Sequence, residues 1–434
     1  MFSKDAILIL LQRSWQAFAG LITVVFVATY FSPSEQGWYY AFTSLAALVS
    51  LIELGLSSTI LNSTAFYFSD KKSNQLLVLK ENPILFSFIK QAFYKYLRLS
   101  IIYISLLSFF GYLYFNEKGI HLESIEWKAQ WFLLIIFTAI SLLISPFFSI
   151  IEGAGSISEV YFVRLMQGIL ASISCWIVIA NNGTLWATVV IPFVSTFVAL
   201  IWLTNWRNEL IKKSSYSYSN NNLFRWDKEI KPLQNKVAIS WLSTYFMSQL
   251  STPILFFYCD PVVAGKMGLT LTIAHMIGHL SQVPIIKTIP NLYIASFNKS
   301  FTFKDNLFAK SVKFFLILFI LGASLFVLAF IYILPFEYSN RLLPLDEILK
   351  LLLFVLFYQI CLAFSIHLRA FKFEPLFPIY ALGAFLTVYG SIHIASLRQA
   401  SGVVDVMLII QAFIVFPLCL YIWNKTIKQL KNKK

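Results

Sequence analysis

The residues most able to do chemistry are charged side chains inside long apolar stretches. Arg13 lies within an apolar stretch at 6 to 31, and Glu53 lies within the next one, at 38 to 61. With a helical rise of roughly 1.5 Å per residue, each lies about one turn from the centre of its helix, on the same side of the membrane. A charge at that depth is costly and usually functional. Two roles stay open: a structural ion pair, or an arginine that binds an anionic substrate with Glu53 as its partner or protonation switch.

Two histidines form a second candidate group. His275 and His279 are four residues apart, so on a helix they project from one face. Histidine changes its charge near physiological pH, which would suit a proton-coupled step or a contact with phosphate. A buried pair of hydrogen-bonded histidines is the alternative interpretation.

Further basic residues lie near the ends of apolar stretches, where long side chains often snorkel to the interface. They are Arg98, Arg164, Lys287, His367 and Arg369. Together with Arg13 they make one half of the predicted membrane region cationic, and a negatively charged substrate would be received there. Arginine can hold phosphate with a bidentate fork that lysine lacks. The candidate substrate-binding residues are Arg13, Glu53, Arg164, His275, His279, His367 and Arg369.

The composition indicates that these residues are positioned by membrane helices. Of the 434 residues, 58% are hydrophobic and 12% are charged, which a single soluble domain could not bury. The net charge of +14 comes from basic residues spread over short loops, without the basic face of a nucleic-acid-binding protein. The expected fold class is all-α, a polytopic membrane protein with twelve spanning helices. These are predicted at 6–31, 38–61, 96–115, 130–151, 160–180, 184–204, 237–259, 265–287, 311–334, 348–370, 376–397 and 403–424.

Lysine and arginine in alternate loops predict the orientation. The loops and tail on one side, with the helix ends beside them, carry 24 of these residues, and those on the other side carry four, Lys118, Lys128, Arg341 and Arg398. Because positive loops stay inside, both termini are expected to be cytoplasmic.

An internal repeat predicts two halves. Pro33 and Gly37 follow the first predicted helix, and Pro261 and Gly265 follow the seventh, at an offset of 228 residues. Six helices separate the two copies, so both would cross the membrane in the same direction, as a parallel repeat. The predicted domains are a six-helix bundle at 1–204, a cytoplasmic linker at 205–236 rich in Ser, Asn and charge, and a second bundle at 237–434 with a basic tail.

Catalysis and cofactors find little support in the sequence. The four cysteines, Cys175, Cys259, Cys361 and Cys419, fall within or at the ends of predicted helices, and neither a disulfide framework nor a metal site is implied. A Gly-x-x-x-x-Gly-Lys-Ser/Thr motif is absent, which argues against an ATP-driven exporter. We therefore expect a transporter without a cofactor rather than an enzyme.

The first 65 residues resemble the opening of the Wzx-type polysaccharide flippases. In that family a Pro-x-x-x-Gly-aromatic turn, here Pro33 to Tyr39, precedes a helix that ends in an acidic residue, Leu and Gly, here Glu53 to Gly55. The segment 151–155, Ile-Glu-Gly-Ala-Gly, with Arg164 is similar to the connection between helices 4 and 5 of the family.

The resemblance implies the fold of the multidrug/oligosaccharidyl-lipid/polysaccharide exporter superfamily, two pseudo-symmetric six-helix bundles around a cavity. It also implies a substrate, an oligosaccharide repeat unit such as that of O-antigen on undecaprenyl diphosphate, flipped across the bacterial inner membrane during lipopolysaccharide biosynthesis. Implied partners are membrane lipid, a polysaccharide polymerase, a chain-length regulator and a coupling ion, H⁺ or Na⁺.

The sequence is also compatible with other functions. A cation-coupled drug antiporter of the same fold would share the topology and could use Glu53, His275 and His279 for coupling. A lipid II flippase is expected to have two further helices. A membrane polymerase or glycosyltransferase is expected to have a large outer loop, whereas the predicted outer loops are at most about 14 residues long.

Overall fold

A computed structural model gives the structure of the chain. It describes residues 4–53, 55–57, 60–61, 64, 83–119, 126–210, 231–288, 301–369 and 374–432, so most of the predicted linker lies outside the described residues. Within these ranges the regular structure is helical and contains no strand. Nine of the described helices are long and apolar enough to span a membrane, and the last of them, Phe377–Gln429, is long enough for two crossings. The all-α, polytopic membrane fold is thus confirmed.

Residues 1–31 and 45–238 form the first of two compact units. Its helices are α1 (Lys4–Tyr30), α3 (Val49–Glu53), α6 (Pro83–Gly119), α7 (Lys128–Gly153), α8 (Ile157–Ala180) and α9 (Trp186–Leu210). Indole groups hold α1 against α8: Trp15 Nε1 donates to Ser172 Oγ over 3.2 Å, and Trp176 Nε1 donates to Thr23 Oγ1 over 2.9 Å. From the first of these pairs to the second, the residue number increases on both helices, so α1 and α8 run in the same direction.

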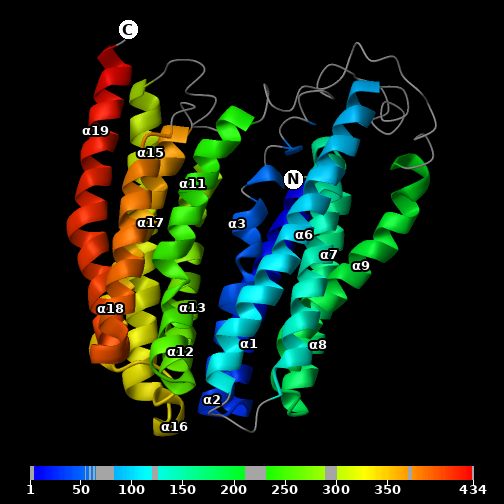
Figure 1. Cartoon of the computed structure of the whole chain (residues 1–434). Helices are drawn as coiled ribbons and strands as arrows, with labels where there is room; N and C mark the ends of the chain where they lie inside the picture. The colour runs from blue at the N-terminus through cyan, green and yellow to red at the C-terminus, as the bar shows by residue number, and fades with distance from the viewer. Residues whose placement is uncertain are drawn as a thin grey trace. The chain divides into compact units, whose positions relative to one another are not determined.

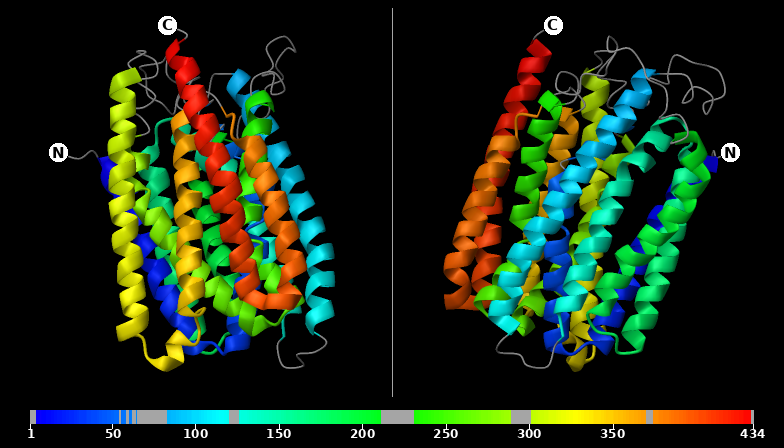
Figure 2. Two further views of the ribbon diagram at one scale, coloured as in Figure 1. Left: turned by 90° about the vertical axis from the view of Figure 1, so that its left-hand side faces the viewer. Right: turned by 45° about the vertical axis from the view of Figure 1, so that its right-hand side comes forward.

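Residues 32–44 and 239–434 form the second unit. Its elements are most of α2 (Pro33–Ala46), the second part of α11 (Lys231–Ser248), α12 (Ser251–Tyr258), α13 (Pro261–Ser281), α15 (Phe301–Leu328), η2 (Ala329–Ile333), α16 (Phe336–Ser339), α17 (Leu345–Arg369), α18 (Phe377–Ile409), η3 (Ile410–Val415) and α19 (Phe416–Asn432). Figures 1 and 2 show α17 running beside both α15 and α19. Gln399 has a φ of 50° inside α18 and marks the kink between the last two crossings.

The two Pro-x-x-x-Gly motifs pack directly on each other within the second unit. A Cβ atom on Gly37 would lie 1.8 Å from the carbonyl oxygen of Pro261, and one on Gly265 would lie 2.8 Å from the backbone nitrogen of Gly37. The side chain of Gln36 donates to the carbonyl oxygens of Gly265, over 2.8 Å, and Arg341, over 3.1 Å. The start of α2 therefore associates with the C-terminal half of the chain, although the sequence boundaries place it in 1–204. The domain boundaries as such stay a prediction.

Two predicted helices are interrupted. The helix expected at 38–61 stops at Ala46 and resumes as α3 at Val49, and the one expected at 237–259 is broken between Ser248 and Ser251. The third helix is longer than predicted, because α6 begins at Pro83 rather than at residue 96. Two basic residues, Lys90 and Lys95, lower the hydropathy of the turns before residue 96. A helix can continue through such turns where the lipid ends, since headgroups and water solvate the charges.

Candidate functional site

Arg13 is an exposed residue on α1 and forms no ion pair with any residue that the structure describes. It lies two residues before Trp15, whose ring packs on Gly168 of α8. The charge of Arg13 acts on the hydroxyl of Tyr161, also on α8. The α1–α8 pairing therefore brings Arg13 to the first turns of α8.

Arg164 lies in the same part of the first unit. Its Nη2 atom is 3.3 Å from Glu152 Oε2, and its guanidinium carbon is 5.3 Å from the ring centroid of Tyr161 and 5.7 Å from that of Phe148. The Glu152 carboxylate also lies close enough to the Tyr161 hydroxyl to act on it. We call Arg13, Glu152, Tyr161 and Arg164 the unit 1 cationic cluster. It holds two guanidinium groups and one carboxylate, so it carries an excess positive charge.

Sequence reasoning missed Tyr161 as a member of this cluster and found Glu152 only through the resemblance. Glu152 ends α7 and Arg164 lies eight residues into α8, with the turn at Ala154 to Ser156 between the helices. Because Glu152 and Arg164 lie on different helices, helical periodicity does not relate them. The sequence signal for their pairing was an acidic residue at the end of one apolar stretch and an arginine within the next.

Glu53 is held by hydroxyl groups. Tyr96 donates to Glu53 Oε1 over 2.9 Å, Ser145 does so over 3.4 Å, and Ser57 donates to the same oxygen. The structure does not form the Arg13–Glu53 ion pair that the sequence left open. The reason is packing, because α1 lies on α8 whereas α3 lies against α6 and α7. Glu53 therefore bonds to hydroxyl groups of α6 and α7 rather than to the partner that depth alone suggested.

The histidine pair shares one face of α13, as predicted. The two rings are stacked with centroids 6.0 Å apart and an interplanar angle of 24°. His275 is buried, and its ring meets that of Tyr358 of α17 edge to face at 5.9 Å. Neither ring nitrogen of His275 has a hydrogen-bond partner among the described residues, whereas His279 is exposed. The alternative of two hydrogen-bonded buried histidines does not fit this geometry.

The substitution His275→Phe tests whether this imidazole has a role in the transport that the sequence predicts. Phenylalanine keeps the ring contacts and removes two buried polar atoms, each worth about 1–3 kcal/mol when unpaired, so protein abundance and thermal stability are expected to be retained or improved. Transport is expected to fall, because phenylalanine cannot carry a proton. Unchanged transport in His275→Phe at normal abundance would remove His275 from the coupling step, and His279→Phe gives the comparison on the exposed ring.

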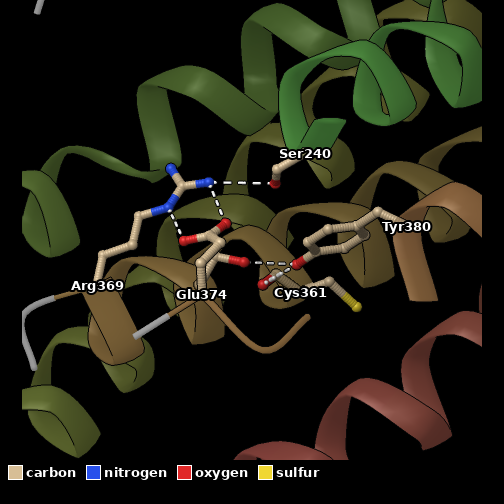
Figure 3. A network of polar contacts seen from close by, with 6 residues as sticks. Ser240, Cys361, Arg369, Glu374 and Tyr380 are labelled. Carbon is tan, nitrogen blue, oxygen red and sulfur yellow. Dashed lines mark hydrogen bonds and ion pairs between the residues drawn. The ribbon is translucent and has the colours of Figure 1, made fainter. Parts of the chain in front are cut away.

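His367 and Arg369 lie at the end of α17 in structural surroundings. Trp423 Nε1 donates to His367 Nδ1 over 3.0 Å, and the ring of Phe308 stacks on the imidazole at 4.2 Å. Arg369 forms a bidentate pair with Glu374, in which Nε and Nη2 each lie 2.6 Å from a carboxylate oxygen, and Nη2 also reaches Ser240 Oγ over 3.2 Å (Figure 3). This pair joins the end of α17 to the approach to α18. A role for either residue in substrate binding stays a prediction.

A second set of hydrogen-bonded residues lies beside the Arg369–Glu374 pair (Figure 3). The Tyr380 hydroxyl of α18 donates to the carbonyl oxygen of Cys361 over 2.8 Å and lies 2.8 Å from the Ser365 hydroxyl. Across the described residues, no three His, Cys, Asp or Glu side chains are grouped closely enough to hold a metal ion.

No family model matches the chain, and no curated protein matches it. Solved structures do match. An inward-facing multidrug resistance MATE family transporter of the MOP superfamily is 12% identical, with 98% of this chain and 99% of that chain covered and a TM-score of 0.65. The outward-facing conformation of such a transporter is 13% identical, with 99% and 97% covered and a TM-score of 0.58.

The lipid II flippase MurJ, in an inward closed conformation, is 18% identical, with 98% of this chain and 90% of that chain covered and a TM-score of 0.57. Coverage of almost the whole chain at this similarity identifies an architecture and leaves the substrate open. The chain is therefore a multi-pass membrane protein with the all-helical, two-lobe fold that MATE transporters share with MurJ.

Proposed function

We propose that the chain is a flippase that moves undecaprenyl-diphosphate-linked oligosaccharide repeat units from the cytoplasmic to the outer leaflet of the bacterial inner membrane. The unit 1 cationic cluster carries this proposal. Arg13 is an arginine in a membrane helix with no ionic partner among the described residues. Arg164, which pairs with the one carboxylate of the cluster, acts on the same tyrosine hydroxyl as Arg13 does. Charge-assisted, bidentate bonds to a diphosphate would use this excess positive charge.

The physical need for such a protein follows from solvation. A diphosphate and several sugars would lose their hydration in the hydrocarbon core at prohibitive cost. A polar path through the protein removes most of that barrier while the prenyl chain stays in the bilayer, and alternating access then exposes the path to the other side. The similarity to a lipid II flippase supports the proposal, because lipid II is named as that protein's substrate.

Reconstitution tests the proposed function directly. The purified chain in liposomes is expected to expose a prenyl-diphosphate-linked oligosaccharide of the inner leaflet to an external glycosidase faster than protein-free liposomes do. The double substitution Arg13→Ala and Arg164→Ala is expected to reduce this rate to the protein-free level. Exposure by the wild-type protein at the protein-free rate would refute the proposal, as would normal surface polysaccharide in a deletion strain.

A cation-coupled drug antiporter is the second candidate, because the inward-facing multidrug resistance transporter matches the chain with a TM-score of 0.65, compared with 0.57 for MurJ. The same liposomes discriminate the two functions. An imposed H⁺ or Na⁺ gradient should drive the movement of a cationic dye if the chain is an antiporter, and should leave the dye in place if it is a flippase.

The proposed orientation places both termini and residues 205–236 in the cytoplasm. Fusions of alkaline phosphatase and of a fluorescent protein after Ser219 and at the C-terminus are expected to give fluorescence and no phosphatase activity, since the 24 basic residues of that side favour retention inside. Strong phosphatase activity after Ser219 would reverse the orientation. The polymerase, the chain-length regulator and the coupling ion remain proposed partners.

A further inference from the structure

An open groove of about 480 Å³ lies on the second unit, between the end of the span Pro261–Thr288 and helix α15. The groove has two parts. Its inner surface is almost wholly apolar, with Val283, Phe314 and Leu318 among the residues that provide it, and the exposed side chains of Lys287 and Lys310 carry positive charge beside that surface. No Asp or Glu is among the described residues that line the groove, so its charge is wholly positive.

Two hydroxyl groups that line the groove connect its two helices. The Ser311 hydroxyl lies 3.4 Å from the Thr288 hydroxyl, and each also donates to a carbonyl of its own helix, Ser311 to Leu307 and Thr288 to Ile285, both over 2.8 Å. These hydroxyl protons are engaged within the protein. An anion at the groove would therefore be bound by the ammonium groups of Lys287 and Lys310, which are both exposed residues.

The two parts of the groove are ordered along the membrane normal. Lys287 is the last residue but one of its span, and Lys310 is five residues into the span Asn306–Ile333. The exposed apolar residues lie deeper, with Val283 one turn before Lys287, and Phe314 and Leu318 one and two turns after Lys310. A cation at headgroup level above an exposed apolar surface matches a phosphate followed by an acyl chain.

We propose that this groove binds an anionic diacyl phospholipid of the surrounding leaflet. Its phosphate lies between Lys287 and Lys310, and one acyl chain lies along Val283, Phe314 and Leu318. The site belongs to a single unit and uses none of the residues assigned to the transported substrate. It therefore stands whether the chain moves a lipid-linked sugar or a drug.

Native mass spectrometry of the detergent-purified full chain tests the site with phosphatidylglycerol and with phosphatidylcholine of the same chain length. The double variant Lys287→Gln, Lys310→Gln is expected to weaken phosphatidylglycerol binding about 30-fold, because each lysine beside an anionic lipid contributes about 1 kcal/mol and 1.4 kcal/mol is a factor of ten. The matched control is Lys313→Gln on the same helix, an exposed lysine that does not line the groove and is expected to retain wild-type binding.

Each single variant is measured as well, with an expected loss of about fivefold, so that poor folding of the double variant does not decide the result. Wild-type phosphatidylglycerol binding in the double and single variants would overturn the proposal, and so would an equal loss in Lys313→Gln. Equal binding of phosphatidylcholine would overturn the preference for an anionic lipid. Tighter binding of undecaprenyl phosphate than of phosphatidylglycerol would refute a phospholipid as the occupant.

Discussion

Replacing Gly37 by alanine is expected to destabilise the chain severely and to abolish the proposed transport. The new methyl group would lie 1.8 Å from the carbonyl oxygen of Pro261, which is a backbone atom and cannot rotate away. The start of α2 and the start of α13 would have to separate by more than 1 Å, since carbon and oxygen atoms normally approach to little less than roughly 3.3 Å. Overpacking typically costs about 1–3 kcal/mol, and the cost here is expected near the upper end because the clash is with a backbone atom.

Thermal unfolding of the purified protein measures this effect, and Gly168→Ala is the matched control. Gly168 also packs against another helix, but its nearest neighbour is a side-chain atom, Trp15 Cδ1, at 3.3 Å from the position of the added Cβ. Small movement of the indole relieves that contact, and alanine gains about 0.5–1 kcal/mol over glycine in a helix. A Gly37→Ala protein as stable as Gly168→Ala would show that α2 does not pack on α13 as described.

The helices were largely predictable because the bilayer imposes a length of about 20 apolar residues on each span. The break between α2 and α3 was not predictable. Residues 45–48 read Leu-Ala-Ala-Leu, without proline or glycine, so neither propensity nor hydropathy indicates an end there. The break falls where the chain passes from the second unit to the first, which ties the interruption to tertiary packing.

The candidate site was predictable only in part, for a related reason. Residue type and depth singled out Arg13 and Glu53, but depth does not say which neighbour a helix packs against. The α1–α8 contact places Arg13 near Tyr161, while Glu53 bonds to Tyr96. The Arg369–Glu374 pair crosses a helix end, where helical periodicity carries no information.

The substitution Arg13→Ala is expected to reduce surface polysaccharide more than about tenfold in a strain that depends on this chain, with protein abundance near normal. A charge-assisted hydrogen bond to a diphosphate is worth about 1.5–3 kcal/mol, and 1.4 kcal/mol corresponds to a factor of ten. The folded state should tolerate the change, because Arg13 is exposed and forms no ion pair with a described residue. Lys90→Ala, which removes an exposed cation on α6 of the same unit, is the control and should leave surface polysaccharide unchanged.

Two further variants separate substrate binding from a structural role for Arg13. Arg13→Lys should restore transport only in part, because lysine keeps the charge and loses the bidentate fork. Glu53→Gln should be well expressed, since glutamine can still accept the hydrogen bond from Tyr96.

If Arg13 served mainly to neutralise Glu53, removing both charges together would recover transport, just as replacing both partners of a buried ion pair together can leave a protein stable. We expect the double variant to stay inactive at normal abundance, because Glu53 bonds to hydroxyl groups of α6 and α7 and leaves Arg13 available for the substrate. Wild-type surface polysaccharide in the double variant would rule out the binding role of Arg13.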